Sequence, residues 1–323
     1  MLFVNQWDYL SMQLYTQYMS QEFTDLHIDF SPASLMVLNL AIAFIMFGVA
    51  LGIQKSEFIE ITKNPKSVFF GVLSQFALLP LFTFLLILVV KPLPELALGM
   101  MLVAASPGGN VSNFFSQQSG GNVALSVSLT AIATVASVFM TPLNFEFYGS
   151  LYVNKKDIQE ITIEFWPMVK TVFTILIIPL VSGLLVASNL PKLTKKIVKP
   201  IRIISFLILL IFMVVAFSKN VEVFSAYYKY IIVLVFLHNG VSFAVGYFTG
   251  KLAKLPMKDV RTITIETGIQ NSGLALVLIF SLFDGNGGMA LLAAWWGIWH
   301  IAAGSTIAYF FKKANSNTVE VPT

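Results

Sequence analysis

The chain has 323 residues, of which 57% are hydrophobic and only 11% are charged, and its formal net charge at pH 7 is +4. Together with a mean hydropathy of +0.80, this composition excludes an ordinary soluble domain and indicates an all-α polytopic membrane protein. The chain contains no cysteine, which excludes a disulfide, a thiol nucleophile and a thiolate metal site.

The first 33 residues carry acidic side chains but no Lys or Arg, and they have no uninterrupted apolar run. They therefore fit neither a secretory signal peptide nor a spanning helix. Trp7 and three tyrosines favour an extracytoplasmic segment at the level of the lipid headgroups; a partly ordered tail is the alternative.

From residue 34 onward, apolar stretches of the length needed to cross a bilayer, about 20 residues each, follow one another with short connections. We predict a transporter domain over 34–312 and a cytoplasmic tail over 313–323. The expected nine spans are 34–53, 67–90, 94–118, 122–147, 166–187, 198–218, 226–250, 257–283 and 287–311.

Basic residues are unevenly distributed over the connections between these spans. If the N-terminus is outside, 14 of the 20 Lys and Arg side chains fall on the inner side. The positive-inside rule then predicts an outer N-terminus and a cytoplasmic C-terminus, in the plasma membrane or, if the protein is bacterial, the inner membrane. Because topology accounts for the net positive charge, we expect no nucleic-acid partner.

The third expected span is interrupted by "SPGGNVSN" at 106–113. Pro107 lacks a backbone donor, and Gly108 and Gly109 permit non-helical dihedral angles. Unpaired backbone groups at membrane depth are tolerated only inside protein or along a cavity. The stretch therefore predicts a helix that splits into two halves.

The eighth expected span has the same kind of interruption, "TIETGIQNSGLAL" at 264–276. The two interrupted spans each precede the last span of their half of the chain. This placement predicts an inverted repeat that lacks its first helix, with two discontinuous crossing helices around a transporter's central site. Close helix packing through small residues is the alternative explanation of the glycines.

Glu266 is a carboxylate well inside the eighth span, 9 residues from its start and 17 from its end, and a charge at that depth is a functional candidate. Its potential partners are oxygen-rich, which suits a hard cation such as sodium. They are Gln75, Ser112, Asn113, Ser126, Thr130 and Gln270. For Ser126 and Thr130, hydrogen bonding to the preceding helical turn is the alternative.

These stretches resemble the bile acid:sodium symporter family. "SPGGNVSNFFSQQSGGNVALSVSLT" is similar to that family's Pro-Gly-Gly-x-x-Ser-Asn element and the helix after it, and "ETGIQNSGLA" to its Glu-x-Gly-x-Gln-Asn element. "GVLSQFALLP" and "LHNG" are similar to further family segments. The likeness runs from about residue 34 to 312.

The resemblance implies two sodium sites behind the crossing. The first site would use Ser112, Asn113, Ser126, Thr130 and Glu266. The second would use Gln75, Gln270, Glu266 and backbone carbonyls near Thr267 and Ile269. It also implies a panel of three helices (34–53, 166–187, 198–218) and a core of the other six.

The chain departs from the family pattern at positions that bear on the solute. "WHIAAGS" keeps His300 but has Ile301 where an amide is usual, Asn110 stands where a threonine is usual, and Ser106 replaces a cysteine. A steroid and a small hydroxy acid such as pantoate both remain open as solutes.

An anionic solute is favoured, because half-helices that begin near Asn110 and Ile269 would direct free N–H groups and positive dipole ends into the cavity. The candidates for orienting the solute are Asn110, Asn271, Ser272 and His300. A lone histidine near a helix end is more often a structural hydrogen bonder.

The function expected from these features is sodium-coupled symport of an organic anion by alternating access. We expect a monomer surrounded by membrane lipids, which is not an enzyme and uses no cofactor beyond the co-transported Na⁺. Proton coupling through Glu266 and a passive channel are the alternatives. An intramembrane protease and an arsenite-type exporter are disfavoured, the latter because the chain lacks the cysteine that those relatives use.

Overall fold

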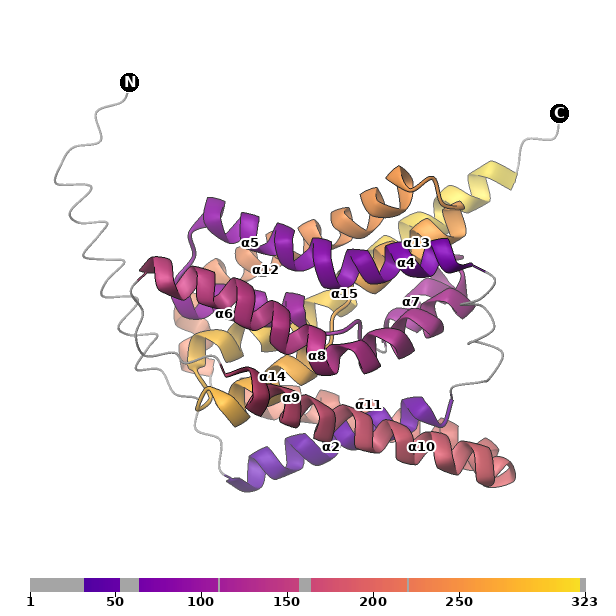
Figure 1. The fold of residues 1–323 in the computed structure, drawn as a ribbon, viewed down its shortest axis with the longest axis horizontal. Coiled ribbons are helices and arrows are strands. Elements are labelled where there is room, and N and C mark those ends of the chain that lie inside the picture. The colour runs from indigo at the N-terminus through magenta and orange to yellow at the C-terminus, as the bar shows by residue number, and fades with distance from the viewer. Residues whose placement is uncertain (1–31, 53–63, 110, 157–163, 220, 320–323) are drawn as a thin grey trace.

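The computed structural model describes residues 32–52, 64–109, 111–156, 164–219 and 221–319, and in this part the chain is helical with no β-strand (Figure 1). The interpretation of residues 1–31 as an interfacial segment and the proposed role of Asn110 lie outside the described residues.

The helices follow the apolar segments of the sequence. Their bounds are α2 Pro32–Ala50, α4 Pro65–Leu73, η1 Ser74–Leu78, α5 Leu79–Val90, α6 Pro94–Ala105, α7 Val111–Gln118, α8 Val123–Lys156, α9 Phe165–Val172, η2 Phe173–Ile177, α10 Ile178–Asn189, α11 Pro191–Lys219, α12 Val221–Leu252, α13 Met257–Gly268, α14 Ser272–Leu282 and α15 Gly287–Val319.

Five helical stretches in the described part of the chain are long and apolar enough to cross a membrane. They are Pro65–Val90, Val123–Tyr152, Phe165–Asn189, Tyr228–Leu252 and Gly287–Ala314. Shorter apolar helices cover Met36–Ala50, Pro94–Ala105 and Ser272–Leu282. The chain is therefore a multi-pass, all-helical membrane protein.

Two π-helical turns, η1 and η2, lie just before prolines inside long helices. Pro80 follows η1 and Pro179 follows η2. A proline has no N–H group and its ring clashes with the carbonyl four residues earlier, and a π-turn relieves that clash. At η1, Asn144 of α8 donates to the carbonyl of Phe76, four residues before Pro80, at 2.9 Å.

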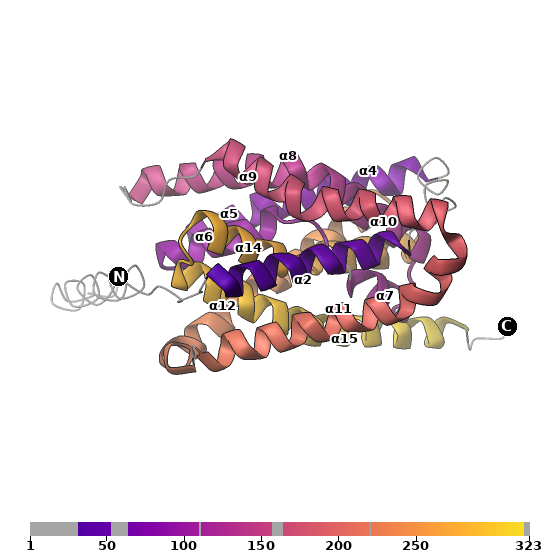
Figure 2. The ribbon, with the colours of Figure 1, turned by 90° about the horizontal axis from the view of Figure 1, so that it is seen from below.

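Helices α2, α10 and α11 gather on one side of the molecule, with α9 beside them (Figures 1 and 2). Gly183 of α10 allows close contact with α2, because a Cβ at that position would lie 2.5 Å from Ala50 Cβ and 2.7 Å from the Phe47 carbonyl oxygen. We call α2, α9, η2, α10 and α11 the side layer.

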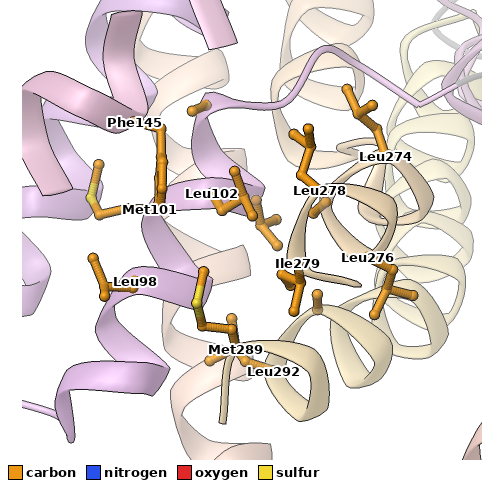
Figure 3. Packing of buried hydrophobic residues seen from close by; sticks show 14 of the residues in the cluster. Leu98, Met101, Leu102, Phe145, Leu274, Leu276, Leu278, Ile279, Met289 and Leu292 are labelled. Atoms are coloured by element: carbon orange, nitrogen blue, oxygen red, sulfur yellow. The ribbon is translucent and has the colours of Figure 1, made fainter. Parts of the chain in front are cut away.

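The short helices α6, α13 and α14 occupy the centre of the molecule. Residues 95–105, 259–268 and 272–280 are buried without interruption, as expected of helices that other helices surround on all sides. Much of the apolar core packs between α6, α8, α14 and α15. Figure 3 shows Met101 and Leu102 of α6 in this core with Leu278 of α14 and Met289 of α15.

Candidate functional site

The first interruption lies between α6 and α7. Helix α6 ends at Ala105 and the chain becomes extended at Ser106, with φ −71° and ψ 154°. The Ala105 carbonyl, which has no partner within the helix, accepts a hydrogen bond from Thr141 of α8 at 2.7 Å. Helix α7 begins at Val111. The expected break at Pro107 is confirmed.

The second interruption lies between α13 and α14. Helix α13 ends at Gly268, Ile269 is extended, and Asn271 caps α14 by accepting a hydrogen bond from Leu274 N at 3.0 Å. A Cβ at Gly268 would lie 2.2 Å from two ring carbons of Phe243, so only glycine fits there. The break predicted in 264–276 is confirmed, although the second half-helix begins at Ser272 and not near Ile269.

The two interruptions cross and are joined by their backbones. Gly108 and Gln270 form an antiparallel bridge. Gly109 N donates to Ile269 O at 2.8 Å, and Asn271 N donates to Pro107 O at 2.8 Å. These bonds satisfy backbone groups that would otherwise be unpaired inside the molecule.

Glu266, on the last turn of α13, is fully buried beside this crossing. Its Oε1 accepts hydrogen bonds from Ser112 of α7 at 2.6 Å and from Ser126 of α8. Thr130 Oγ1 lies 3.2 Å from Oε2, and the same hydroxyl lies 3.5 Å from Asn113 Oδ1. The structure therefore brings together all five residues of the first expected ion site.

These partners of Glu266 are all uncharged. Thr130 Oγ1 also lies 3.1 Å from the Ser126 carbonyl oxygen, so the expected back-bonding is present as well. A hydroxyl has one proton but two acceptor lone pairs. The same hydroxyls can therefore turn their oxygen atoms towards a cation bound at the carboxylate.

A second set of polar groups, the amides of Gln75 and Gln270, also lies close to the crossing. Gln75 and Gln270 are each only 1% exposed. Both polar side-chain atoms of Gln75, and Oε1 of Gln270, have no hydrogen-bond partner in the described part of the chain. A buried polar group without a partner costs about 1–3 kcal/mol, and such groups call for an explanation.

Gly108 places Gln75 close to the carboxylate. A Cβ at Gly108 would lie 3.0 Å from Glu266 Oε2 and 3.4 Å from Gln75 Oε1, so both oxygens border the space that this glycine leaves free. Gln270 Nε2 donates to the Thr267 carbonyl at 2.8 Å. Ile269 O, already bonded to Gly109 N, keeps a second lone pair. The residues expected at the second ion site thus lie around the crossing.

The expected solute-orienting residues are less closely grouped. Asn271 is partly exposed at the start of α14, and Ser272 is 7% exposed. Ile42 of the side layer lies next to them, 3.5 Å from the position of a Cβ at Gly273. His300 of α15 is buried one helical turn before Gly304, whose Cβ position lies 2.9 Å from Ile269 Cδ1. The Nδ1 atom of His300 has no hydrogen-bond partner in the described part of the chain.

Several polar residues support the site but were not predicted. Ser74 Oγ lies 2.8 Å from Thr267 Oγ1, and Asn239 of α12 donates to the Gly268 carbonyl at 2.7 Å. Ser116 Oγ lies 3.1 Å from Ser126 Oγ. Ser74 adjoins Gln75, and Asn239 lies in "LHNG", yet neither stretch indicates which side chain faces the break.

Comparison with known proteins supports the family resemblance found in the sequence. A profile of the Sodium Bile acid symporter family matches residues 39–227. The chain is 29% identical over 285 residues to the uncharacterized sodium-dependent transporter YocS of Bacillus subtilis (strain 168), covering 85% of this chain and 83% of that protein.

Two mammalian relatives extend the comparison. The P3 protein of Bos taurus is 33% identical over 261 residues, 79% of this chain, and this chain spans about half of its length, 53%. The human ileal sodium/bile acid cotransporter is 29% identical over 244 residues, 75% of this chain and 68% of that protein. The YocS and ileal relatives are named as a transporter and a cotransporter. With more than half of its length matched by the family profile, the chain belongs to the sodium bile acid symporter family.

Proposed function

We propose that the protein is a secondary active transporter that couples the inward movement of sodium to that of an organic anion. The observation that carries this proposal is the buried carboxylate of Glu266 at the crossing, held by the hydroxyl groups of Ser112, Ser126 and Thr130. Family membership supports the same reading. A carboxylate with only oxygen-bearing neighbours suits a hard cation, and a transported ion needs no cofactor.

In this proposal one sodium ion binds on the hydroxyl side of Glu266. Its ligands come from Ser112 and Asn113 of α7, Ser126 and Thr130 of α8, and Glu266 itself. Because these side chains already contact one another, their positions are largely set before the ion arrives. Such preorganisation lowers the cost of binding.

A second ion binds on the amide side, where Gln75, Gln270 and Glu266 meet the carbonyls of Thr267 and Ile269. The unpartnered Oε1 atoms of Gln75 and Gln270 support this assignment, because a cation would satisfy both. Glu266 then serves both ions, and the two sites are coupled through one negative charge.

The solute binds between the crossing and the side layer. Helices α7 and α14 both begin at the crossing, and the positive ends of their dipoles favour an anion there. Asn271 and Ser272 orient the solute, together with Asn110 and His300. The candidate solutes are a bile acid-like steroid and a small hydroxy acid such as pantoate.

We further propose that the transporter domain, 34–312, has nine spans in an inverted repeat. Each broken pair, α6 with α7 and α13 with α14, counts as one span. The side layer is the panel and the remaining helices are the core, and alternating access arises from movement of one against the other. Gly183 has no side chain and lets α10 approach α2 closely, which supports tight packing within the panel.

The same proposal places the N-terminus outside and the C-terminus in the cytoplasm of a monomer in the plasma membrane. Because the chain has no cysteine, Ser20→Cys and Ser316→Cys each introduce a single thiol. An impermeant thiol reagent applied to intact cells should label only the first variant. Labelling of the second alone contradicts the topology.

The test of the function is uptake of radiolabelled bile acids and hydroxy acids into proteoliposomes, with sodium and proton gradients imposed separately. We expect uptake against the solute gradient under a sodium gradient, rising more steeply than first order with sodium concentration. Absence of concentrative uptake for every solute class under both gradients, with solute flux that does not saturate, identifies a channel instead.

Proton coupling is the second candidate, and one observation favours keeping it. Glu266 is fully buried and its hydrogen-bond partners are neutral hydroxyls. A buried carboxylate in such surroundings can also carry a proton. Concentrative uptake driven by a pH gradient without sodium identifies this mechanism.

A further inference from the structure

Beyond Glu266, helix α13 carries a second buried carboxylate that the proposed ion sites do not use. Asp259, at the start of α13, is 5% exposed. Its Oδ2 accepts from Ser67 of α4 at 2.6 Å, and its Oδ1 accepts from Asn122 Nδ2 at 2.9 Å. Like Glu266, it is held by neutral groups on neighbouring helices.

The two carboxylates lie on the same face of α13. They are seven residues apart, which is two helical turns and a separation of about 10 Å along the axis. Thr262 lies between them on that face and is fully buried. Its hydroxyl accepts from Asn122 N at 2.8 Å and donates to Asn122 O at 3.1 Å.

The facing side of α8 has the matching spacing. Asn122, which caps α8 by accepting from Leu125 N at 3.1 Å, contacts Asp259 and Thr262. Ser126, one turn further, contacts Glu266. Polar residues on α8 therefore face polar residues on α13 at matching positions, from Asp259 to Glu266.

Helix α7 completes this arrangement. Ser116 Oγ lies 3.1 Å from Ser126 Oγ. A Cβ at Gly121 would lie 2.7 Å from Thr262 Oγ1 and 3.0 Å from the Ser116 carbonyl oxygen. Oxygen atoms of α7 and α13 thus lie so close to Gly121 that a side chain would clash with them. We call Ser116, Asn122, Ser126 and Thr262, between Asp259 and Glu266, the polar seam.

Two positively charged side chains have described contacts near this end of α13. Lys251 Nζ lies 3.9 Å from Met257 Sδ. Arg261 Nη1 donates to the Ser119 carbonyl at 3.2 Å, and its guanidinium carbon lies 5.9 Å from the centre of the Phe311 ring of α15. The described hydrogen-bond partners of the Asp259 carboxylate are instead the neutral side chains of Ser67 and Asn122.

From this arrangement we propose that the polar seam is the route by which sodium passes between Glu266 and the membrane side near the start of α13, with Asp259 as a relay site for the monovalent cation. This inference rests on the proposed sodium-coupled function. A cation that leaves Glu266 needs oxygen ligands at each step, because an unsolvated charge in an apolar interior is very costly. The seam supplies hydroxyl, amide and carbonyl oxygens in succession, with a carboxyl group at each end.

The first test compares ion binding with ion movement in the full-length protein. Asp259→Asn keeps the size of the side chain and leaves Glu266 untouched. We expect equilibrium sodium binding to stay within twofold of the wild type, whereas radiolabelled sodium exchange across proteoliposomes falls tenfold or more. Asp259→Glu should restore part of the exchange rate. Asp284→Asn, in the turn between α14 and α15, is the matched control and should change neither quantity.

A second measurement tests the route even if Asp259→Asn loses sodium binding because it folds poorly. Thr262→Cys introduces a single thiol into the seam of this cysteine-free chain. We expect a cationic methanethiosulfonate to react with it at least tenfold faster than an anionic one of similar size, and sodium to slow the reaction. Equal rates for both reagents, or no effect of sodium, overturn the route.

The outcomes separate this inference from the function beneath it. If the wild type exchanges sodium and Asp259→Asn exchanges it at the same rate, the route is wrong and the sodium-coupled function stands. If the wild type neither binds nor exchanges sodium, the proposed function is wrong and the route falls with it.

Discussion

The two sides of Glu266 differ in how their polar groups are satisfied. On the hydroxyl side, Ser112 and Ser126 donate directly to the carboxylate. On the amide side, Gln75 and Gln270 are equally buried but present amide atoms that have no hydrogen-bond partner in the described chain. One side is complete without an ion, and the other is not.

This difference has an energetic consequence. Side chains that bond to one another stabilise the fold whether or not an ion is present, whereas unpartnered buried amides cost free energy until a ligand satisfies them. The hydroxyl side therefore holds the carboxylate in position with or without an ion. The amide side makes the stability of the protein depend on the ion.

The largest effect should come from Glu266, which both sides share. Glu266→Gln keeps the size but removes the charge. At an effective dielectric constant of about 20 and a contact of about 2.4 Å, one cation–carboxylate pair contributes roughly 7 kcal/mol before desolvation is subtracted. We expect sodium-driven uptake to fall at least 100-fold. The measurement is initial uptake in proteoliposomes, with Glu146→Gln of α8 as the control. Retained steep sodium dependence would remove the shared carboxylate from the mechanism.

Gln75→Leu tests the amide side alone. It removes two unpartnered buried groups, so unfolding without sodium should become harder by about 1–3 kcal/mol. Stabilisation by added sodium should shrink at the same time, with sodium affinity reduced about tenfold or more. Thermal melting with and without sodium measures both effects. Gln117→Leu, at an exposed position of α7, is the control, and equal behaviour of the two variants would contradict the comparison.

Asn271→Leu tests whether Asn271 binds the solute while Gln75 and Gln270 bind the ion. Asn271 is partly exposed towards α2, unlike Gln75 and Gln270. We expect solute affinity to fall about tenfold, which corresponds to about 1.4 kcal/mol, with sodium affinity changed less than threefold. Competition binding with labelled solute provides the measurement. The reverse pattern would assign Asn271 to the ion.

The smallest effect is expected on the hydroxyl side from Thr130→Val, which removes one hydroxyl at nearly constant volume. Ser112 and Ser126 still hold the carboxylate. Losing one hydrogen-bonding group costs about 1 kcal/mol, so sodium affinity should fall about fivefold and the stability without sodium should decrease. Thr134→Val, whose hydroxyl bonds only to its own helix at 2.8 Å, controls for helix effects. An increase in stability without sodium would show that this side also carries unsatisfied groups.

Much of this arrangement could be predicted from the sequence, because its causes are local. Pro107 and Gly268 interrupt their helices wherever they lie in space, and a carboxylate deep inside an apolar segment, such as Glu266, is a functional candidate from its position alone. The hydroxyls at positions 126 and 130 are one helical turn apart, so their common face followed from helix geometry.

What the sequence could not provide was the pairing between distant helices. Asn239 and Thr141 donate hydrogen bonds to carbonyl groups at the ends of the broken helices. Nothing in the sequence around Asn239 or Thr141 indicates these partners. The start of the second half-helix at Ser272 depends on the cap that Asn271 provides. The ion-binding roles of Glu266 and of its hydroxyl and amide neighbours remain predictions.

The hydrogen bonds at the crossing are made by main-chain atoms, from Gly109 to Ile269 and from Asn271 to Pro107. A mutation to any residue other than proline leaves the amide groups of these residues in place, so changes of side chain can alter solute preference here without removing these bonds. Proline at position 109 or 271 would remove a donor N–H group, and an amide-to-ester replacement would do so without changing the side chain. The backbone contact between the two broken helices can therefore persist while the side chains around it, and the solute that they select, change.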